Sequence, residues 1–309
     1  MTTLLYTHPS CLEHETGAHH PERPARLNAI YAVLDGADFA ALDRREPPRA
    51  SEQQIGLVHP ESYIAFVMES IPENGITMLD ADTSVSPGSR EAALRAAGAA
   101  CAAVDAVFSG EAGNAFCAVR PPGHHAEPTR PMGFCVFNNV AIGAEHARKT
   151  HGLQRAAVVD FDVHHGNGTQ AMFFDDPDLF YASTHQAPLY PGTGAEYERG
   201  VAGNIVNRPL PAGAGSAEFR AAMEKHILPS LRAFGPDFVF ISAGFDGHAD
   251  DPLAGLRLRE DDYAWITEEL LQLAADTCGG RLVSMLEGGY DLDALGRSVG
   301  AHVRALMAA

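Results

Sequence analysis

The sequence predicts an α/β fold in which helices cover both faces of a central, mostly parallel sheet. Short, continuously apolar runs recur along the chain, and longer helical stretches separate them. Continuous apolar runs are typical of parallel strands buried on both faces, whereas strands with one wet face alternate apolar and polar residues. A doubly wound, three-layer sandwich is the simplest architecture with this alternation of strands and helices.

Six apolar runs are expected to form strands of this sheet. Most are too continuous in apolar residues for strands that face water on one side. They cover residues 4–7, 115–119, 156–161, 179–183, 238–243 and 282–286.

Four longer stretches between these runs are expected to be helices: residues 89–108, 140–150, 217–234 and 260–277. Pro87 and Ser216 stand at the beginning of two of them and are typical of helix starts. No internal repeat, low-complexity tract or Pro/Gly/Ser-rich linker divides the chain. Residues 1–309 are therefore expected to form a single domain.

Composition argues against several classes of function. No apolar stretch approaches the roughly 18 residues of a membrane span, and the N-terminus lacks a secretory signal, so a cytoplasmic location is the default expectation. The net charge of −18 disfavours nucleic acid and favours a cationic substrate. The cysteines show no C-x-x-C spacing, so the sequence suggests neither a disulfide framework nor a thiolate metal site. The cysteines expected to be buried free thiols are Cys11, Cys101, Cys117, Cys135 and Cys278.

Ionisable side chains follow four of the predicted strands. Ligands of open parallel sheets bind beyond the carboxyl ends of the strands, so we expect these side chains to meet at one site. In chain order they are His124 and His125, then Asp162, His164 and His165, then Asp246, and finally Tyr290.

Asp162 and His164 are two residues apart, so in an extended or turning segment both side chains can point toward one ion. Asp246 would complete an Asp-His-Asp set. Catalytic zinc sites typically have three protein ligands and one open position. This oxygen-rich set would also accept Fe²⁺ or Mn²⁺. The alternative interpretation of an isolated Asp-x-His is a surface loop or an ion pair.

His124 and His125 lie in a Pro-Pro-Gly loop that can hold two imidazoles against a metal-bound water, although adjacent histidines in loops are usually just exposed. Asp160 can accept a proton from one imidazole and determine its tautomer. Asn167 can orient the other without adding charge, which leaves a neutral base. Tyr290 follows two glycines, and its hydroxyl can donate to an oxyanion.

Phe134 and Tyr190 stand beside glycine and proline and can form an aromatic slot around an alkyl chain, with ordinary core packing as the alternative. Residues 14–26 are expected to form part of the rim that selects the substrate. His14, His19 and His20 in this segment are interpreted as exposed polar residues.

Seven motifs in order resemble the class II histone deacetylase and acetylpolyamine amidohydrolase family: HPERPARL, RPPGHHAE, GFCVFNNVAIGA, DFDVHHGNGTQ, YPGTG, SAGFDGHADDPLAGL and EGGYDL. The resemblance extends from about Tyr6 to Leu306. It implies an arginase-like α/β fold, a zinc ion, and hydrolysis of N-acyl amines to a carboxylate and a free amine.

The resemblance also implies two ion sites. The zinc ligands would be Asp162, His164 and Asp246, with the metal lowering the pKa of its bound water. A neighbouring potassium ion would use Asp160, the hydroxyl of Ser183, and backbone carbonyls of Asp162, His164 and Thr184.

The same resemblance gives roles to the catalytic side chains. His124, paired with Asp160, would stabilise charge. His125 would be the general base toward water and then the acid toward the leaving nitrogen. Tyr290 would polarise the carbonyl, and Asn167 in place of aspartate agrees with the class II pattern.

For substrate binding, the resemblance makes Phe134 and Tyr190 the walls of the acyl-amine tunnel and Asp82 an anchor for the substrate amide at its rim. Polyamine-specific relatives place a glutamate shortly after the metal aspartate, where this chain has Leu253. This difference argues mildly against polyamine specialisation.

Three alternatives stay open at this point. The substrate can be protein acyl-lysine, an acetylpolyamine or another small amide. An arginase-type ureohydrolase would need two manganese ions and more bridging carboxylates than this set offers. The presence of Tyr290 and His125 argues against a catalytically silent binder of acylated amines. The sequence also leaves open whether the chain forms a homo-oligomer.

Overall fold

An eight-stranded sheet forms the centre of the computed structural model, which describes residues 2–309, and every strand pairing in it is parallel. The strand order is β2-β1-β5-β10-β9-β6-β7-β8. A separate antiparallel pair joins β3 and β4. The strands are β1 Thr3–Tyr6, β2 Asp43–Arg45, β3 Thr77–Met78, β4 Ser84–Val85, β5 Asn114–Cys117, β6 Ala156–Asp160, β7 Leu179–Gln186, β8 Ile205–Leu210, β9 Phe238–Ala243 and β10 Leu282–Leu286.

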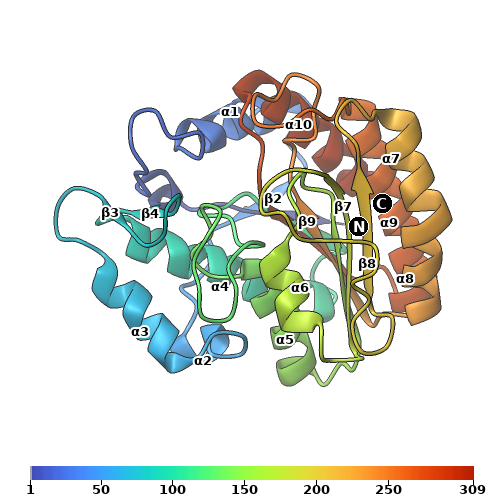
Figure 1. Ribbon diagram of the computed structural model, residues 1–309, viewed down its shortest axis with the longest axis horizontal. Helices are drawn as coiled ribbons and strands as arrows, with labels where there is room; N and C mark the ends of the chain where they lie inside the picture. The colour runs from blue at the N-terminus through green and yellow to red at the C-terminus, as the bar shows by residue number, and fades with distance from the viewer. Residues whose placement is uncertain (1) are drawn as a thin grey trace.

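Two groups of helices flank the sheet (Figure 1), which confirms the predicted α/β class. Helices α4 and α5 pack together on one side, whereas α10 packs against both α1 and α9 on the other. The helices are α1 Ala25–Leu34, α2 Glu52–Ile55, α3 Glu61–Ser70, α4 Ser89–Phe108, α5 Asn139–His151, α6 Asn167–Phe173, α7 Ser216–Ala222, α8 Leu228–Phe234, α9 Glu260–Cys278 and α10 Leu292–Met307.

Each of the six predicted apolar runs overlaps a strand, and these strands are fully buried. The two strands of the large sheet that the apolar pattern does not predict are its edges, β2 and β8. Edge strands have one neighbour and partly face water, so they carry polar residues. β8 even contains Pro209, which lacks a backbone N–H and is tolerated at an edge.

The prediction of one continuous α-helix over residues 217–234 is wrong. It begins at Ser216, but a π-helical turn over Met223–Ile227 separates α7 from α8. Pro229 in the first turn of α8 has no N–H to donate, and its ring displaces the carbonyl one turn earlier. A local widening of the helix accommodates both effects.

The buried core surrounds the sheet and extends to both ends of the chain. Oγ1 of Thr3 donates to the backbone carbonyl of Leu306 at 3.2 Å, so the first strand and the last helix lie side by side. All five cysteines are buried and unpaired, as predicted. Within residues 2–309, no helix is long and apolar enough to cross a bilayer.

Candidate active site

The four strands that precede the predicted polar clusters are consecutive neighbours in the sheet, in the order β5-β10-β9-β6. All four run in the same direction, so their carboxyl ends lie along one edge. The side chains that follow them therefore meet, as expected from the sequence.

Asp162, His164 and Asp246 converge at this edge. Nδ1 of His164 lies 3.1 Å from Oδ1 of Asp162 and 3.2 Å from Oδ2 of Asp246. The three ligand atoms lie within 4.8 Å of one another. Both carboxylates are buried, and His164 is only partly exposed. Two carboxylate oxygens and one imidazole nitrogen are a donor set that suits a divalent metal ion.

The electrostatics of these carboxylates also favour a cation. Burial raises the pKa of Asp246, and the neighbouring Asp162 raises it further. Two neighbouring buried carboxylates disfavour each other's ionised form, and a bound cation offsets the repulsion between them. Gly244 and Gly288 keep the space clear, because a Cβ at either position would overlap these carboxylates.

His124 is held by carboxylates on two sides. Its Nδ1 lies 2.9 Å from Oδ2 of Asp160, and its backbone N–H donates to Oε2 of Glu287 at 3.1 Å. Burial by itself lowers the pKa of His124, but Asp160 and Asp162 outweigh burial and raise the pKa to about 10. These carboxylates therefore favour the protonated form of His124.

His125 has the opposite electrostatic environment. Its Nδ1 lies 2.9 Å from Oδ1 of Asn167, whose Nδ2 donates to Oε1 of Glu127 at 2.8 Å. Burial lowers the pKa of His125 well below its usual value, and the nearby His124 lowers it further. His125 is therefore neutral, and its ring lies 4.0 Å from that of His124, centroid to centroid.

Tyr290 lies in the loop between β10 and α10. Its backbone N–H donates to Oδ2 of Asp251 at 2.7 Å, and the guanidinium of Arg26 lies 5.0 Å from the centroid of its ring. Arg26 in turn donates to the backbone carbonyl of Gly289 at 2.6 Å. Burial raises the pKa of Tyr290 well above 10, so its hydroxyl stays protonated and can donate.

A cavity of about 220 Å³ lies directly over these groups. All four residues predicted to bind the substrate line it, together with candidate catalytic and metal-binding residues. The lining residues are Asp82, His125, Gly133, Phe134, His164, Leu189, Tyr190, Leu253 and Tyr290.

The aromatic side chains form the walls of this cavity rather than part of the core. Tyr190 is 39% exposed and lies edge-on to His125, with ring centroids 5.2 Å apart. Phe134 lies edge-on to Tyr290 at 6.0 Å. Phe134 has φ = 69°, the one positive φ of a non-glycine residue within residues 2–309, and backbone strain of this kind is concentrated at functional sites.

Asp82 and Thr83 hold this strained segment in place. Oδ1 of Asp82 accepts from the backbone N–H of Gly133 at 2.9 Å, and Oγ1 of Thr83 accepts from that of Phe134 at 3.2 Å. Asp82 therefore lies at the cavity wall and also supports the backbone of that wall.

The residues predicted to hold potassium lie behind the Asp-His-Asp set. Asp160 in β6 is the register partner of Ser183 in β7, and both are fully buried, while Thr184 is nearly so. Oδ1 of Asp160 accepts from the backbone N–H of Asp162 at 3.1 Å. The potassium candidate Asp160 and the zinc candidates Asp162 and His164 therefore lie on one short segment at the end of β6.

Four histidines from the sequence analysis lie outside this arrangement. His165 contacts Thr193 and Gln170 instead of the Asp-His-Asp set. The expected exposure of His14 is wrong: it is buried, with Nδ1 2.6 Å from Oγ of Ser89. His19 is exposed as expected, whereas His20 is partly buried with its ring 4.6 Å from that of Phe134.

Four residues that support the site were not singled out from the sequence: Arg26, Glu127, Asp251 and Glu287. Each lies inside one of the quoted motifs, but nothing in the spacing showed what it contacts. Glu287 carried the clearest signal, because it directly follows a continuously apolar strand and a buried carboxylate needs partners. Its Oε2 accepts from the backbone N–H of Gly123 at 2.7 Å.

Comparisons with known proteins identify the family of this chain. The family model described as "Histone deacetylase domain" matches residues 20–306. "Histone deacetylase 14, chloroplastic" of Arabidopsis thaliana is 39% identical over 98% of this chain and 76% of its own length. "Histone deacetylase-like amidohydrolase" of Pseudomonas aeruginosa is 38% identical over 93% of this chain and 81% of its own length.

Among solved structures, the crystal structure of the HDA15 HD domain superposes with a TM-score of 0.93 at 35% identity, covering 99% of this chain and 88% of that one. The match extends over the sheet and over the loops that carry the candidate site. The chain therefore belongs to the histone deacetylase family and is a hydrolase that acts on amides.

Proposed function

We propose that the protein is a zinc-dependent deacylase that removes acetyl or related acyl groups from N-acyl amines such as acyl-lysine. The observation that carries this proposal is the convergence of Asp162, His164 and Asp246 at the base of a cavity that also exposes His125 and Tyr290. When bound, zinc would lower the pKa of a water molecule and polarise the amide carbonyl.

One side chain, His125, acts as both the general base and the general acid. Neutral His125 accepts the proton of the attacking water at Nε2, because its Nδ1 faces Asn167. It then delivers this proton to the leaving nitrogen, so that the C–N bond breaks to give a carboxylate and a free amine. The same imidazole serves both steps because the low pKa returns it to the neutral form.

Charge stabilisation comes from two other groups. His124, kept protonated by Asp160, places a positive charge beside the reacting centre. The protonated hydroxyl of Tyr290 donates to the carbonyl oxygen as negative charge develops there. Both groups are in place before the substrate binds, so the reaction requires little reorganisation.

The cavity supports a substrate with a slender apolar stem. Phe134 and Tyr190 would enclose this stem, and Asp82 would accept a hydrogen bond from the substrate amide at the rim. Leu253 on the same wall offers no charge to a second amino group, which favours acyl-lysine or a small N-acyl amine over a polyamine.

Asp160 with Ser183 and Thr184 would hold a potassium ion, whose charge offsets the buried Asp160 carboxylate. Neither a nucleic acid nor a membrane partner is expected. The single-domain organisation of residues 1–309, the cytoplasmic location and a possible homo-oligomer stay predictions.

Purified, zinc-replete protein should release free amine from at least one of three reporters: acetyl-lysine peptide, acetylpolyamine or trifluoroacetyl-lysine. Removing zinc with a chelator should stop the release, and restoring zinc should recover it. Tight binding of acyl-lysine without product would instead support a silent binder, and two manganese ions per chain would support a ureohydrolase. Failure to release amine from any reporter contradicts the proposal.

A further inference from the structure

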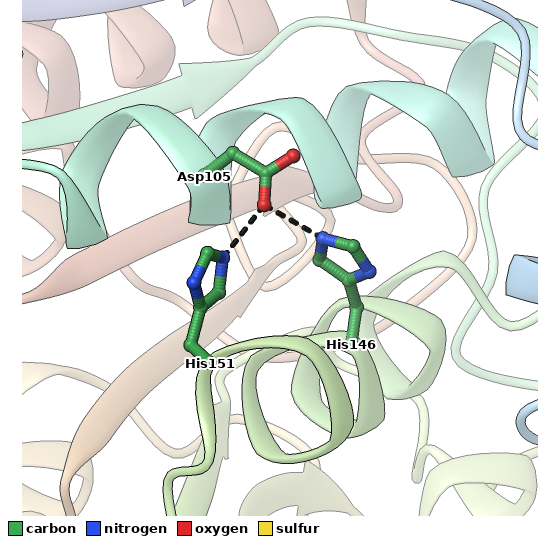
Figure 2. A group of neighbouring side chains, drawn as sticks. All are labelled: Asp105, His146 and His151. Atoms are coloured by element: carbon green, nitrogen blue, oxygen red, sulfur yellow. Dashed lines mark hydrogen bonds and ion pairs between the residues drawn. The ribbon is translucent and has the colours of Figure 1, made fainter.

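Three side chains far from the candidate active site form a second cluster with metal-ligand chemistry. Asp105 lies in the last turn of α4, and His146 and His151 lie in the final turns of α5. Nε2 of each imidazole is 2.7 Å from the same oxygen, Oδ1 of Asp105. Figure 2 shows both rings reaching from α5 toward that one carboxylate on α4.

This cluster lies at the opposite edge of the sheet from the cavity. Helix α4 leads into the start of β5, and α5 leads into the start of β6, so both helices end near the amino ends of the strands. The proposed catalytic residues follow the carboxyl ends of the same strands. A group bound here takes no part in the amide chemistry.

We propose that Asp105, His146 and His151 bind a divalent transition-metal ion, of which zinc is the best match. Two imidazole nitrogens and one carboxylate oxygen suit zinc, with water as the fourth ligand. The three ligand atoms already lie within 4.8 Å of one another. They come from two helices that pack together, so the ion would tie α4 to α5.

The geometry needs only a small adjustment to accept the ion. Ligand atoms in a tetrahedral zinc site with bonds of about 2.0 Å are about 3.3 Å apart, so Asp105 must move away from the rings by roughly half an ångström. The side chain of Asp105 is 52% exposed and free to move. Its exposure also provides an entry path for the ion and room for a water ligand.

Neighbouring side chains hold both imidazoles ready for a metal. Nδ1 of His146 lies 3.1 Å from Oγ1 of Thr150, which can accept the Nδ1 proton and leave Nε2 free to bind the ion. The ring of His151 stacks on Phe108 with centroids 4.1 Å apart. The side chain of His146 is 6% exposed and that of His151 is 17% exposed, so neither ring is freely mobile.

The helix dipoles supply an independent reason for a cation at this position. Asp105 and His151 lie in the last turns of their helices, where unpaired carbonyls give partial negative charge. Asp105 adds a full negative charge to the unfavourable end of α4. A dication would neutralise the carboxylate and interact favourably with both helix ends.

Zinc content measured by mass spectrometry, after dialysis at a fixed free zinc concentration, tests this site. The wild type should hold one zinc ion more per chain than His151→Gln and than Asp105→Asn. Both variants should keep wild-type turnover, which shows that they are folded and that the catalytic ion is retained. His226→Gln changes an exposed histidine on another helix and should match the wild type.

Asp246→Asn separates the two sites, because it should lose the catalytic ion and keep the ion at Asp105. Anomalous diffraction at the zinc edge should give a peak between Asp105, His146 and His151 in the wild type and none there in His151→Gln. Equal zinc content in the wild type, His151→Gln and Asp105→Asn, or no anomalous peak at the cluster, overturns the proposal. In that case the cluster is a pair of hydrogen bonds that share one carboxylate oxygen.

Discussion

Nδ1 of His125 lies 2.9 Å from Oδ1 of Asn167, and this contact determines which nitrogen of the imidazole carries a proton. The carboxylate of Glu127 only accepts hydrogen bonds, so it must face the NH₂ group of Asn167. The amide oxygen then faces His125, whose Nδ1 must donate. Nε2 is left with its lone pair toward the cavity, as a general base requires.

Asn167→Asp should move the acidic limb of the pH–rate profile to higher pH. A carboxylate beside His125 favours the protonated ring, so the pKa of His125 rises, and the neutral base is lost at a higher pH than in the wild type. Opposite charges at this distance shift a pKa by roughly one to three units. The measurement is kcat/KM against pH, with Asn28→Asp at an exposed position of α1 as a control of equal charge change. An unchanged limb would mean that His125 is not the base.

Tyr290→Phe should lower kcat by about 100- to 1,000-fold, the usual effect of losing one oxyanion donor. The ring remains, so its packing against Phe134 and Arg26 should persist and KM should change little. Turnover and zinc content are measured on the same preparation. Loss of zinc along with activity would show that Tyr290 has been assigned the wrong role.

Asp251→Asn should reduce kcat without loss of zinc. The Asp251 carboxylate accepts from the backbone N–H groups of Tyr290, Asp291 and Leu253, so it positions both the proposed oxyanion donor and one cavity wall. An amide can offer only one acceptor oxygen in its place. Misplacement of a catalytic group by about 1 Å costs roughly 100-fold in rate.

Asp250→Asn is the matched control for this change. Its carboxylate makes surface ion pairs with Arg259 and Arg297 and contacts nothing in the cavity. Such pairs contribute about 1 kcal/mol or less, so turnover should match the wild type. Equal turnover in Asp251→Asn and Asp250→Asn would show that Asp251 does not position Tyr290.

His302→Gln should make folding less sensitive to acid. His302 is fully buried between the hydroxyls of Thr267 and Ser284, and burial lowers its pKa to about 3. Below the unfolded-state pKa of about 6.5, the unfolded chain binds a proton that the folded chain does not. Stability is therefore lost as pH falls from about 6.5 toward 3.

Between pH 7 and pH 5 this histidine accounts for roughly 2 kcal/mol of lost unfolding free energy. Urea unfolding of the wild type and His302→Gln at both pH values measures the difference. Exposed His226→Gln should leave the wild-type pH dependence unchanged. An equal pH dependence in His302→Gln would show that His302 titrates normally.

The sequence alone determined the buried strands of the sheet and the chemical identity of the residues that follow them. Continuous apolar runs are local signals, and the strands at 156–160, 179–186, 238–243 and 282–286 overlap their predicted ranges closely for that reason. The edge strands were missed because one exposed side permits polar residues. The π-helical turn before α8 was missed because a helical pattern does not show how Pro229 is accommodated.

Only the tertiary structure decided which of these residues meet. The strand order β5-β10-β9-β6 places four clusters from distant parts of the chain along one edge, and no local pattern encodes that order. The same holds for Glu127, which orients Asn167, and for Asp105, which meets two histidines from the next helix. Residue types come from the sequence, whereas their partners depend on long-range packing of strands and helices around a common core.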